Sequence, residues 1–408
     1  MSTRSSPVNA LGAPSVDELV EASLQQAQTL AGYDSKPRLV VSPYRFNPLG
    51  AHIDHQGGSV LARCLDQYTL LYFWPRQDSR CRVYANIDSS AWQSVEFSAG
   101  DIPDLYGWDA MARAAVTAFS TEYTLTTGVD AVVMGTLISG GLSSSASVVL
   151  AYLTALADVN DVKLAARQLV ELVKRVENDY RGLNNGVQDQ MSIVFGRSDH
   201  MVLLDVERVS AREIADPQNS GDVSFLMCYS GVSRDLVTGS NFNMRVAECR
   251  AAAAALSPSA HHLGEVPEAM RTDAALSTLS NTGQRRARHV YGEMERVHSG
   301  CMAWADGNWA SFGQLMNDSC FSSIHHYESG SPWLIDLHTM ASRINGVYGS
   351  RFSGGGFGGC LFMLIDASRA NAVADELLSR YLKKYPELVN KARISLARSE
   401  STVRVVSI

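Results

Sequence analysis

The chain lacks several features that would place it in other classes of protein. It has no apolar run of about 18 residues, so we expect no membrane-spanning helix and no membrane partner. The segment from Met1 to Ala13 lacks the apolar middle of a secretory signal, which favours a cytoplasmic location. A net charge of −7 disfavours nucleic acid as a partner. We therefore expect a soluble protein with small-molecule partners.

Cysteine is scarce, and its spacing is uninformative. The seven cysteines are an odd number, with no C-x-x-C pair and no histidine at zinc-finger spacing. We therefore expect reduced, buried thiols.

The remaining composition is that of a globular protein with a large core. The chain has 408 residues, of which 46% are hydrophobic, and only 12 prolines, so it is neither disordered nor fibrous. The length favours two domains. The polar segment 208–222 is the best linker candidate. We therefore expect an N-terminal domain over residues 1–215 and a C-terminal domain over residues 216–408.

Local patterns predict a mixture of helices and strands. Ser15 and Glu18 form a capping box that opens a helix. Further helices are predicted at 109–119, 146–156, 163–178, 243–256, 285–304, 308–321 and 367–384. Strands are predicted at 38–42, 68–74, 82–86, 92–97, 129–134, 200–205, 223–229, 348–353 and 360–365. The expected fold class is α+β.

A segment rich in glycine and serine, residues 139–147, runs directly into one of these helices. Its glycines let the backbone approach a ligand, and the helix start offers free N–H groups to an anion. This pattern is typical of a phosphate-binding loop. Because the Walker-type sequence is absent, a loop that simply caps the helix is the alternative.

A second segment, residues 43–58, packs Arg, Asp, Asn, Gln and two histidines among Gly and Pro. Such a loop suits a polyol, whose hydroxyls need donors and acceptors in fixed places. A metal site at His52 and His55 is the competing interpretation, but it lacks a third ligand nearby.

A third segment, residues 353–360, contains five glycines around Phe357. It precedes a predicted strand, whereas a dinucleotide-binding fingerprint follows a strand and opens a helix. This order excludes a nicotinamide-dependent dehydrogenase.

Two acidic residues, Glu177 and Asp189, lie between these segments. Phosphoryl transfer needs a metal ligand and a carboxylate that orients or deprotonates the attacking hydroxyl. These two residues could divide those tasks, although either could instead be a surface carboxylate.

Taken in chain order, the segments 43–58, 139–147 and 353–360 resemble the three motifs of the GHMP small-molecule kinases, and specifically the galactokinase branch. The first motif resembles residues 44–58, the second, G-L-S-S-S-A, residues 141–146, and the third, G-G-G-F-G-G, residues 354–359. The resemblance implies an N-terminal α/β domain, a ferredoxin-like C-terminal domain, and an active site in the cleft between them.

The resemblance also implies roles for single residues. Asp189 falls on the catalytic carboxylate that faces the anomeric hydroxyl, and Arg45 on the arginine paired with it. Ser145 and Glu177 fall on the Mg²⁺ ligands. The positions that resemble sugar contacts are His52, Asp54 and Gly186. The positions that resemble nucleotide contacts are Trp108, Gly140, Gly141, Leu142, Ser143, Ser144, Ser145 and Arg234. The implied cofactors are ATP and Mg²⁺.

Departures from the galactokinase pattern point to the substrate. Ala51 stands where galactokinases have a Glu near the C6 hydroxyl, and Phe242 replaces a sugar-binding Tyr. A Glu about 4 Å from a C6 carboxylate would cost about 4 kcal/mol at an effective dielectric near 20. Its removal admits a sugar acid, and the segment around Ala51 is similar to that of plant galacturonokinases. Tyr44 and His52 are candidates for contacting the carboxylate.

We therefore expect an ATP-dependent sugar 1-kinase that acts on D-galacturonic acid. A kinase for galactose, glucuronic acid or arabinose is the alternative within the enzyme class. A galactokinase-like sugar sensor without turnover is the alternative outside it, and retention of Asp189, Arg45, Ser145 and Glu177 argues against that alternative.

Overall fold

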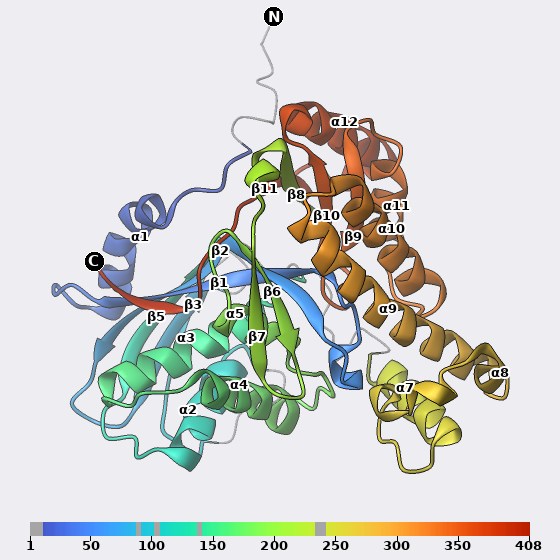
Figure 1. Ribbon diagram of the computed structural model, residues 1–408. Helices are drawn as coiled ribbons and strands as arrows, with labels where there is room; N and C mark the ends of the chain where they lie inside the picture. The colour runs from blue at the N-terminus through green and yellow to red at the C-terminus, as the bar shows by residue number, and fades with distance from the viewer. Residues whose placement is uncertain (1–10, 87–90, 102–106, 137–140, 233–241) are drawn as a thin grey trace, which may run out of the picture.

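A computed structural model describes residues 11–86, 91–101, 107–136, 141–232 and 242–408. Two antiparallel-rich sheets, each covered by helices, divide this part of the chain (Figure 1). The expected α+β class is confirmed.

The first sheet has eight strands in the described part of the chain. Its main path runs in the order β12-β1-β2-β5-β3-β4, with β6 and β7 attached beside β2. The strands are β1 (Arg38–Leu49), β2 (Val60–Pro75), β3 (Cys81–Asn86), β4 (Trp92–Phe97), β5 (Val129–Gly135), β6 (His200–Asp205), β7 (Ser210–Ala215) and β12 (Arg404–Ser407). Only β3 and β5 pair in parallel.

Alternating residues of β1 and β2 bury the two faces of this sheet against different helices, as the strand period of two requires. Val40 and Phe73 pack toward the helices of the 110–194 segment, and Leu39 and Tyr72 pack toward α1 (Val16–Ala31). Those helices are α2 (Ala110–Glu122), α3 (Ser144–Val159), α4 (Ala166–Arg175), a π-helix (Val176–Tyr180) and α5 (Gln188–Val194). The capping box predicted for α1 is present.

The second sheet has the order β11-β8-β10-β9, and all its pairs are antiparallel. Its strands are β8 (Val223–Tyr229), β9 (Val347–Phe352), β10 (Cys360–Asp366) and β11 (Arg393–Ala397). One face packs on α11 (Pro332–Ala341) and α12 (Ala370–Lys384). The remaining helices are α7 (Phe242–Leu256), α8 (Asp273–Leu276), α9 (Asn281–Ala305) and α10 (Trp309–His325). Short 3-10 helices span Asp54–Gln56, Gln218–Asp222, Leu263–Glu265, Glu268–Met270, Ala367–Arg369 and Pro386–Leu388.

A shared aromatic cluster joins the two sheets. The ring of Phe46, on β1, stacks on Phe362 of β10 with 4.4 Å between ring centroids, and it meets Phe225 of β8 edge-on at 4.8 Å. All three rings are buried. This packing fixes β1, which carries part of the functional site, against the second sheet.

The expected linker at 208–222 is wrong, because six of its residues form β7, which pairs with β6 in the first sheet. The segment is polar because the burial of β7 is slight, with only Ile214 buried. Sequence patterns also missed α11, β11 and the return of β12 to the first sheet. The division at residues 215 and 216 stays a prediction, and β12 lies in the first sheet although its residues fall in the second range.

Two further expectations concern the cysteines and membrane-spanning helices. All seven cysteines are buried and free, as expected for reduced thiols. In the described ranges, no helix combines the length and the apolar character needed to cross a bilayer.

Gly349 of β9 tests the close contact between β9 and α10. A Cβ added at Gly349 would lie 1.8 Å from the carbonyl oxygen of Gly313. We expect Gly349→Ala to lower the free energy of unfolding by about 1–3 kcal/mol through overpacking. Gly221→Ala, where nothing lies within 4 Å, is the control. Equal denaturation midpoints for the two variants would contradict this packing.

Candidate active site

A cleft of about 950 Å³ gathers side chains from both halves of the chain. Its lining comes from β1 and the loop after it, the start of α3, the π-helix, the start of α5, the first residue of α7, and the loop between β9 and β10. The three glycine-containing segments singled out in the sequence therefore meet at one place.

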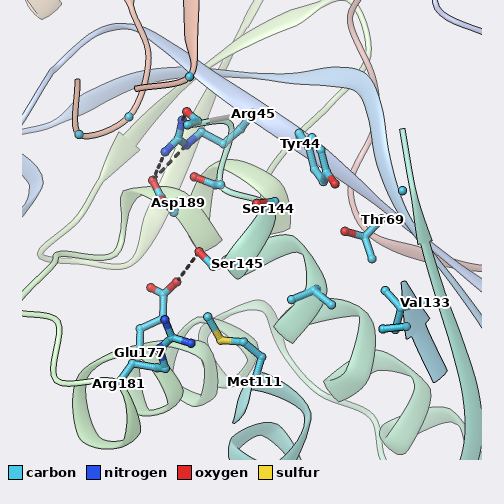
Figure 2. Close-up of a pocket in the computed structure, with 18 of the residues that line it drawn as sticks. Tyr44, Arg45, Thr69, Met111, Val133, Ser144, Ser145, Glu177, Arg181 and Asp189 are labelled. Carbon is cyan, nitrogen blue, oxygen red and sulfur yellow. Dashed lines mark hydrogen bonds and ion pairs between the residues drawn. The ribbon is translucent and has the colours of Figure 1, made fainter. Parts of the chain in front are cut away.

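An ion pair between Arg45 and Asp189 lies in this cleft (Figure 2). Two guanidinium nitrogens of Arg45, Nε and Nη2, donate to the same Asp189 oxygen at 3.0 and 2.6 Å. Its third nitrogen donates to Ser353 Oγ at 3.1 Å. Arg45 is buried, whereas the side chain of Asp189 keeps 21% of its surface exposed. One oxygen of a positioned carboxylate is thus left free to face a ligand.

Glu177 lies on the same side of the cleft, near the start of the π-helix. Ser145 donates to one of its oxygens at 3.2 Å (Figure 2). Asn185 donates to the other at 2.7 Å. Burial, reinforced by the charge of Asp189, raises the pKa of Glu177 to about 7 despite these hydrogen bonds. A bound cation would remove this penalty.

Asp54 is the third carboxylate of the cleft. Its Oδ2 accepts from the backbone N–H of Gln188 at 3.2 Å. Burial and the charge of Asp189 raise the pKa of Asp54 to about 6. Gly186 allows this close approach, because a Cβ there would lie 2.2 Å from Asp54 Oδ2.

The second and third motifs, residues 141–146 and 354–359, lie against each other. A Cβ on Gly141 would lie 3.1 Å from the carbonyl oxygen of Ser353, and one on Gly354 would lie 2.8 Å from that of Gly141. Both glycines also have positive φ angles. Side chains are thus excluded where the two loops meet.

The N-terminus of α3 opens onto the cleft. Ser143, Ser144 and Ser145 all line it, and the side chain of the N-cap residue Ser143 makes no capping hydrogen bond with the described residues. Its first N–H groups lack partners within the helix and carry the positive end of the dipole. This end of the cleft can hold a phosphate.

A stack of rings forms another wall. His52, whose φ of 58° is unusual for a residue with a side chain, stacks on Tyr327 at 4.2 Å between ring centroids. Phe242 lies at the same wall, 6.4 Å from His52. Burial, followed by the charges of neighbouring histidines and Arg351, lowers the pKa of His52 well below its usual value. Its buried Nε2 finds no hydrogen-bond partner among the described residues, so it is available to a ligand.

The other predicted site residues fall into three groups. Trp108 and Tyr44 line the cleft, and Tyr44 lies beside Thr69 (Figure 2). Tyr44 also has a side-chain hydrogen bond with Thr69. Ala51 and Leu142 are buried but are not among the lining residues. Predicted nucleotide contacts at Gly140 and Arg234 lie outside the described residues.

Sequence reasoning missed several participants. Ser353 was given no role of its own within the segment 353–360, although its hydroxyl accepts from Arg45. Asn185, which precedes the predicted sugar contact Gly186, donates to Glu177. Arg181 also lines the cleft. For Asn185 and Arg181, the available signal was that both lie a few residues after Glu177 in the sequence.

The arrangement suits transfer of an anionic group to a hydroxyl. A helix N-terminus for phosphate faces a buried hydroxyl–carboxylate pair, and an arginine-held carboxylate stands beside them. Such a site positions reactants and stabilises charge, as phosphoryl transfer requires.

Comparison with known protein families agrees with this geometry. Residues 110–197 match the GHMP kinases N terminal domain, residues 300–384 the GHMP kinases C terminal domain, and residues 30–74 the galactokinase galactose-binding signature. The segments that carry Arg45, Ser145, Glu177 and Asp189 all fall within these matches.

Relatives match over nearly the whole chain. The galacturonokinase of Arabidopsis thaliana is 33% identical over 92% of this chain and 94% of its own length. The galactokinase of Roseiflexus sp. strain RS-1 is 32% identical, covering 86% of this chain and 89% of its own length. The human galactokinase is 31% identical, covering 88% and 92% respectively.

Solved structures show the same fold. The crystal structure of Lactococcus lactis galactokinase complexed with galactose superposes with a TM-score of 0.86, at 27% identity, over 95% of this chain and 99% of that chain. A mevalonate kinase structure, at 17% identity and a TM-score of 0.62, shares the fold.

The raised pKa of Glu177 predicts a pH-dependent stability. The folded protein retains a proton on Glu177 up to about pH 7, whereas the unfolded chain releases it near the usual pKa of 4.5. The stabilisation present below pH 4.5 is therefore lost as the pH rises through 7. Between about pH 5 and pH 8, the metal-free wild type should lose up to about 3 kcal/mol relative to Glu177→Gln.

Chemical denaturation at both pH values measures this difference. Glu171→Gln, at an exposed position of α4, is the control and should follow the wild type. Parallel stability curves for the wild type and Glu177→Gln would show that the carboxylate is not held in a poorly solvated site.

Proposed function

We propose, because this chain belongs to the galactokinase family of the GHMP kinases, that it transfers the γ-phosphoryl group of ATP to the anomeric hydroxyl of D-galacturonic acid. The products are galacturonate 1-phosphate and ADP. The family consists of phosphotransferases with an alcohol group as acceptor, and the sugar acid is the part of the assignment that needs support from this chain's own residues.

The arginine-held carboxylate supports the reaction type most directly. Asp189 accepts the proton of the anomeric hydroxyl as its oxygen attacks the γ-phosphorus. Arg45 holds one oxygen of Asp189 through two guanidinium N–H groups and leaves the other oxygen to face the sugar. The same cation offsets negative charge that develops on the transferred group.

The polar residues around Glu177 fit a nucleotide with Mg²⁺. Ser145 and Glu177 offer two hard oxygen ligands at 3.2 Å from each other, which leaves the other coordination positions to phosphate oxygens and water. Three carboxylates in the cleft, Asp54, Glu177 and Asp189, favour a cation there. Bound Mg²⁺ would neutralise charge on the phosphates, and the start of α3 would hold them.

The substrate assignment rests on the absence of an acid at position 51. Ala51 follows the strand that carries Arg45 and precedes His52, which lines the cleft. A galactokinase-type Glu here would repel a C6 carboxylate by about 4 kcal/mol at about 4 Å and an effective dielectric near 20. The similarity to a protein named galacturonokinase supports the same substrate.

His52 is the better candidate for contacting the carboxylate. Its buried Nε2 is unpartnered among the described residues and its ring is fixed by stacking on Tyr327. The hydroxyl of Tyr44, by contrast, already bonds with Thr69. A neutral histidine can donate one N–H to a carboxylate oxygen without repelling a neutral sugar.

Galactose is the second candidate substrate, because most of the similar proteins are galactokinases and a galactose complex shares the fold. Glucuronic acid and arabinose are further alternatives. A non-catalytic sugar sensor would bind sugar and ATP without releasing ADP, and it would need neither the base nor the metal ligands.

Asp189→Asn tests the base. The amide cannot accept the proton, so we expect ADP release to fall by at least about a hundredfold while sugar affinity stays within about fivefold. Asp216→Asn is the control, because Asp216 forms a similarly buried pair with Arg63 that is not part of the cleft lining. Turnover in Asp189→Asn at the rate of the control would remove Asp189 from the mechanism.

Ala51→Glu tests the substrate assignment. The ratio of kcat/KM for galacturonic acid to that for galactose should fall by up to about a thousandfold, as the repulsion above converts at 1.4 kcal/mol per decade. Ala51→Gln has nearly the same size without the charge, and its ratio should change far less. An identical ratio in both variants would mean that the C6 group lies away from position 51.

A further inference from the structure

A buried carboxylate from α9 binds the backbone of the loop that precedes the sugar wall. Glu293 Oε1 accepts from the N–H groups of Gly50 and Ala51 at 2.8 and 3.1 Å. Glu293 is 0% exposed, so these bonds form without competing water. The two donors belong to successive residues, and together they fix the direction of the peptide planes that lead into His52.

A second side chain of the same helix completes the grip. His289, one turn before Glu293, contacts the carbonyl oxygen of Ala51 through Nε2 at 2.9 Å. A carbonyl only accepts, so Nε2 carries the proton, and Nδ1 accepts from the Ser322 hydroxyl at 2.9 Å. Burial lowers the pKa of His289 to about 4, which keeps this arrangement neutral.

The loop from Gly50 to His52 has a backbone conformation that needs support from its surroundings. Gly50 has φ 98° and is pressed against Val60, where a Cβ would lie 2.8 Å from the Val60 Cα. His52 has φ 58°, a conformation that side chains disfavour by about 1–2 kcal/mol per residue. Such backbone persists only where its surroundings over-determine it. The contacts from Glu293 and His289 supply that determination on the backbone of Gly50 and Ala51.

Glu293 also connects this loop to the other side of the cleft. Its Oε1 accepts from Ser319 at 2.6 Å, and Ser319 accepts from Arg351 at 2.6 Å. Arg351 lies two residues before Ser353, which binds Arg45. One chain of contacts therefore runs from the sugar loop to the residue that orients the base.

The charge of Glu293 is stable in this setting. Burial would raise its pKa, but the cation of Arg296, which donates to Oε2 at 2.7 Å, and the charge of Arg351 lower it to about 2. A permanently ionised carboxylate is a stronger acceptor for the two N–H groups than a neutral oxygen.

We propose that Glu293 is a positioning residue for sugar binding: it sets the conformation of the loop from Gly50 to His52, and with it the place of the His52 ring. The inference rests on the proposed function in so far as His52 faces the sugar. Among the described residues, the hydrogen bonds of Glu293 reach Gly50, Ala51, Ser319 and Arg296 and not the start of α3, so we expect its loss to act on the sugar and to leave the nucleotide in place.

Two substitutions at Glu293 separate its contributions. Glu293→Ala removes both acceptors, and we expect the sugar KM to rise at least about tenfold while the ATP KM stays within about twofold. Glu293→Gln retains an acceptor oxygen for the two N–H groups and should restore part of the loss. Asp66→Ala is the control, because Asp66 is a buried carboxylate that accepts a backbone N–H, from Arg398, and is not part of the cleft lining.

Sugar KM values within twofold of wild type in both folded Glu293 variants would overturn the proposal. So would a parallel rise of both KM values, which indicates general loosening of the fold. If Glu293→Ala does not fold, Glu293→Gln decides alone, with at least a threefold selective rise in sugar KM expected.

Hydrogen exchange on the peptide spanning residues 44–58 keeps the inference testable apart from catalysis. Exchange should accelerate in the Glu293 variants and stay at the wild-type rate in Asp66→Ala. A wild type that turns over neither galacturonic acid, glucuronic acid, galactose nor arabinose would contradict the proposed function. Unchanged hydrogen exchange in the Glu293 variants would contradict the role of Glu293.

Discussion

The pairing of Arg45 with Asp189 is the interaction on which the rest of the site depends. Arg45 comes from β1 and Asp189 from α5, 144 residues later, and their contact requires the first sheet and its covering helices to be complete. The remaining guanidinium nitrogen contacts Ser353 beside the second sheet. A single buried cation thereby ties the reacting carboxylate to both layers of the molecule.

Two further carboxylates, Asp54 and Glu177, lie near this pair, and the three acidic side chains differ in their partners. Asp54 and Glu177 both have raised pKa values because they are buried near Asp189. Asp189 differs in that two N–H groups of Arg45 bind one of its oxygens. Glu177, paired with neutral donors, is instead suited to a cation that arrives with the nucleotide. Two similar side chains thus acquire different roles from their neighbours.

Much of the candidate site could be predicted from the sequence because its residues lie in short motifs with recognisable chemistry. Arg45, Ser145, Glu177 and Asp189 were named from such motifs, and they meet in one cleft. The grip of Glu293 on Gly50 could not be predicted, since 243 residues separate the partners and the contact involves backbone atoms. His289 and Glu293, one turn apart on the buried face of α9 that also carries Val290 and Val297, were the local signal.

The fold, like the site, was predicted where the signal was local in the sequence. Strands with buried, β-branched or aromatic residues were predicted nearly to their ends, as at 92–97 and 200–205. β7 was mistaken for a linker because it is polar and pairs only at the edge of the sheet, with β6. The course of β1 as far as Leu49 was also missed, because the proline and polar residues there are typical of a loop, while pairing with β2 keeps them extended. Tertiary pairing overrode local preference in both cases.

The central claim is that the cleft accepts a sugar with a carboxylate at C6 and phosphorylates its anomeric hydroxyl. The most direct measurement is ADP release with Mg·ATP when galacturonic acid, glucuronic acid, galactose and arabinose are supplied in turn. The account predicts the highest kcat/KM for galacturonic acid. A higher kcat/KM for galactose, or binding of galacturonic acid without any ADP release, would contradict it.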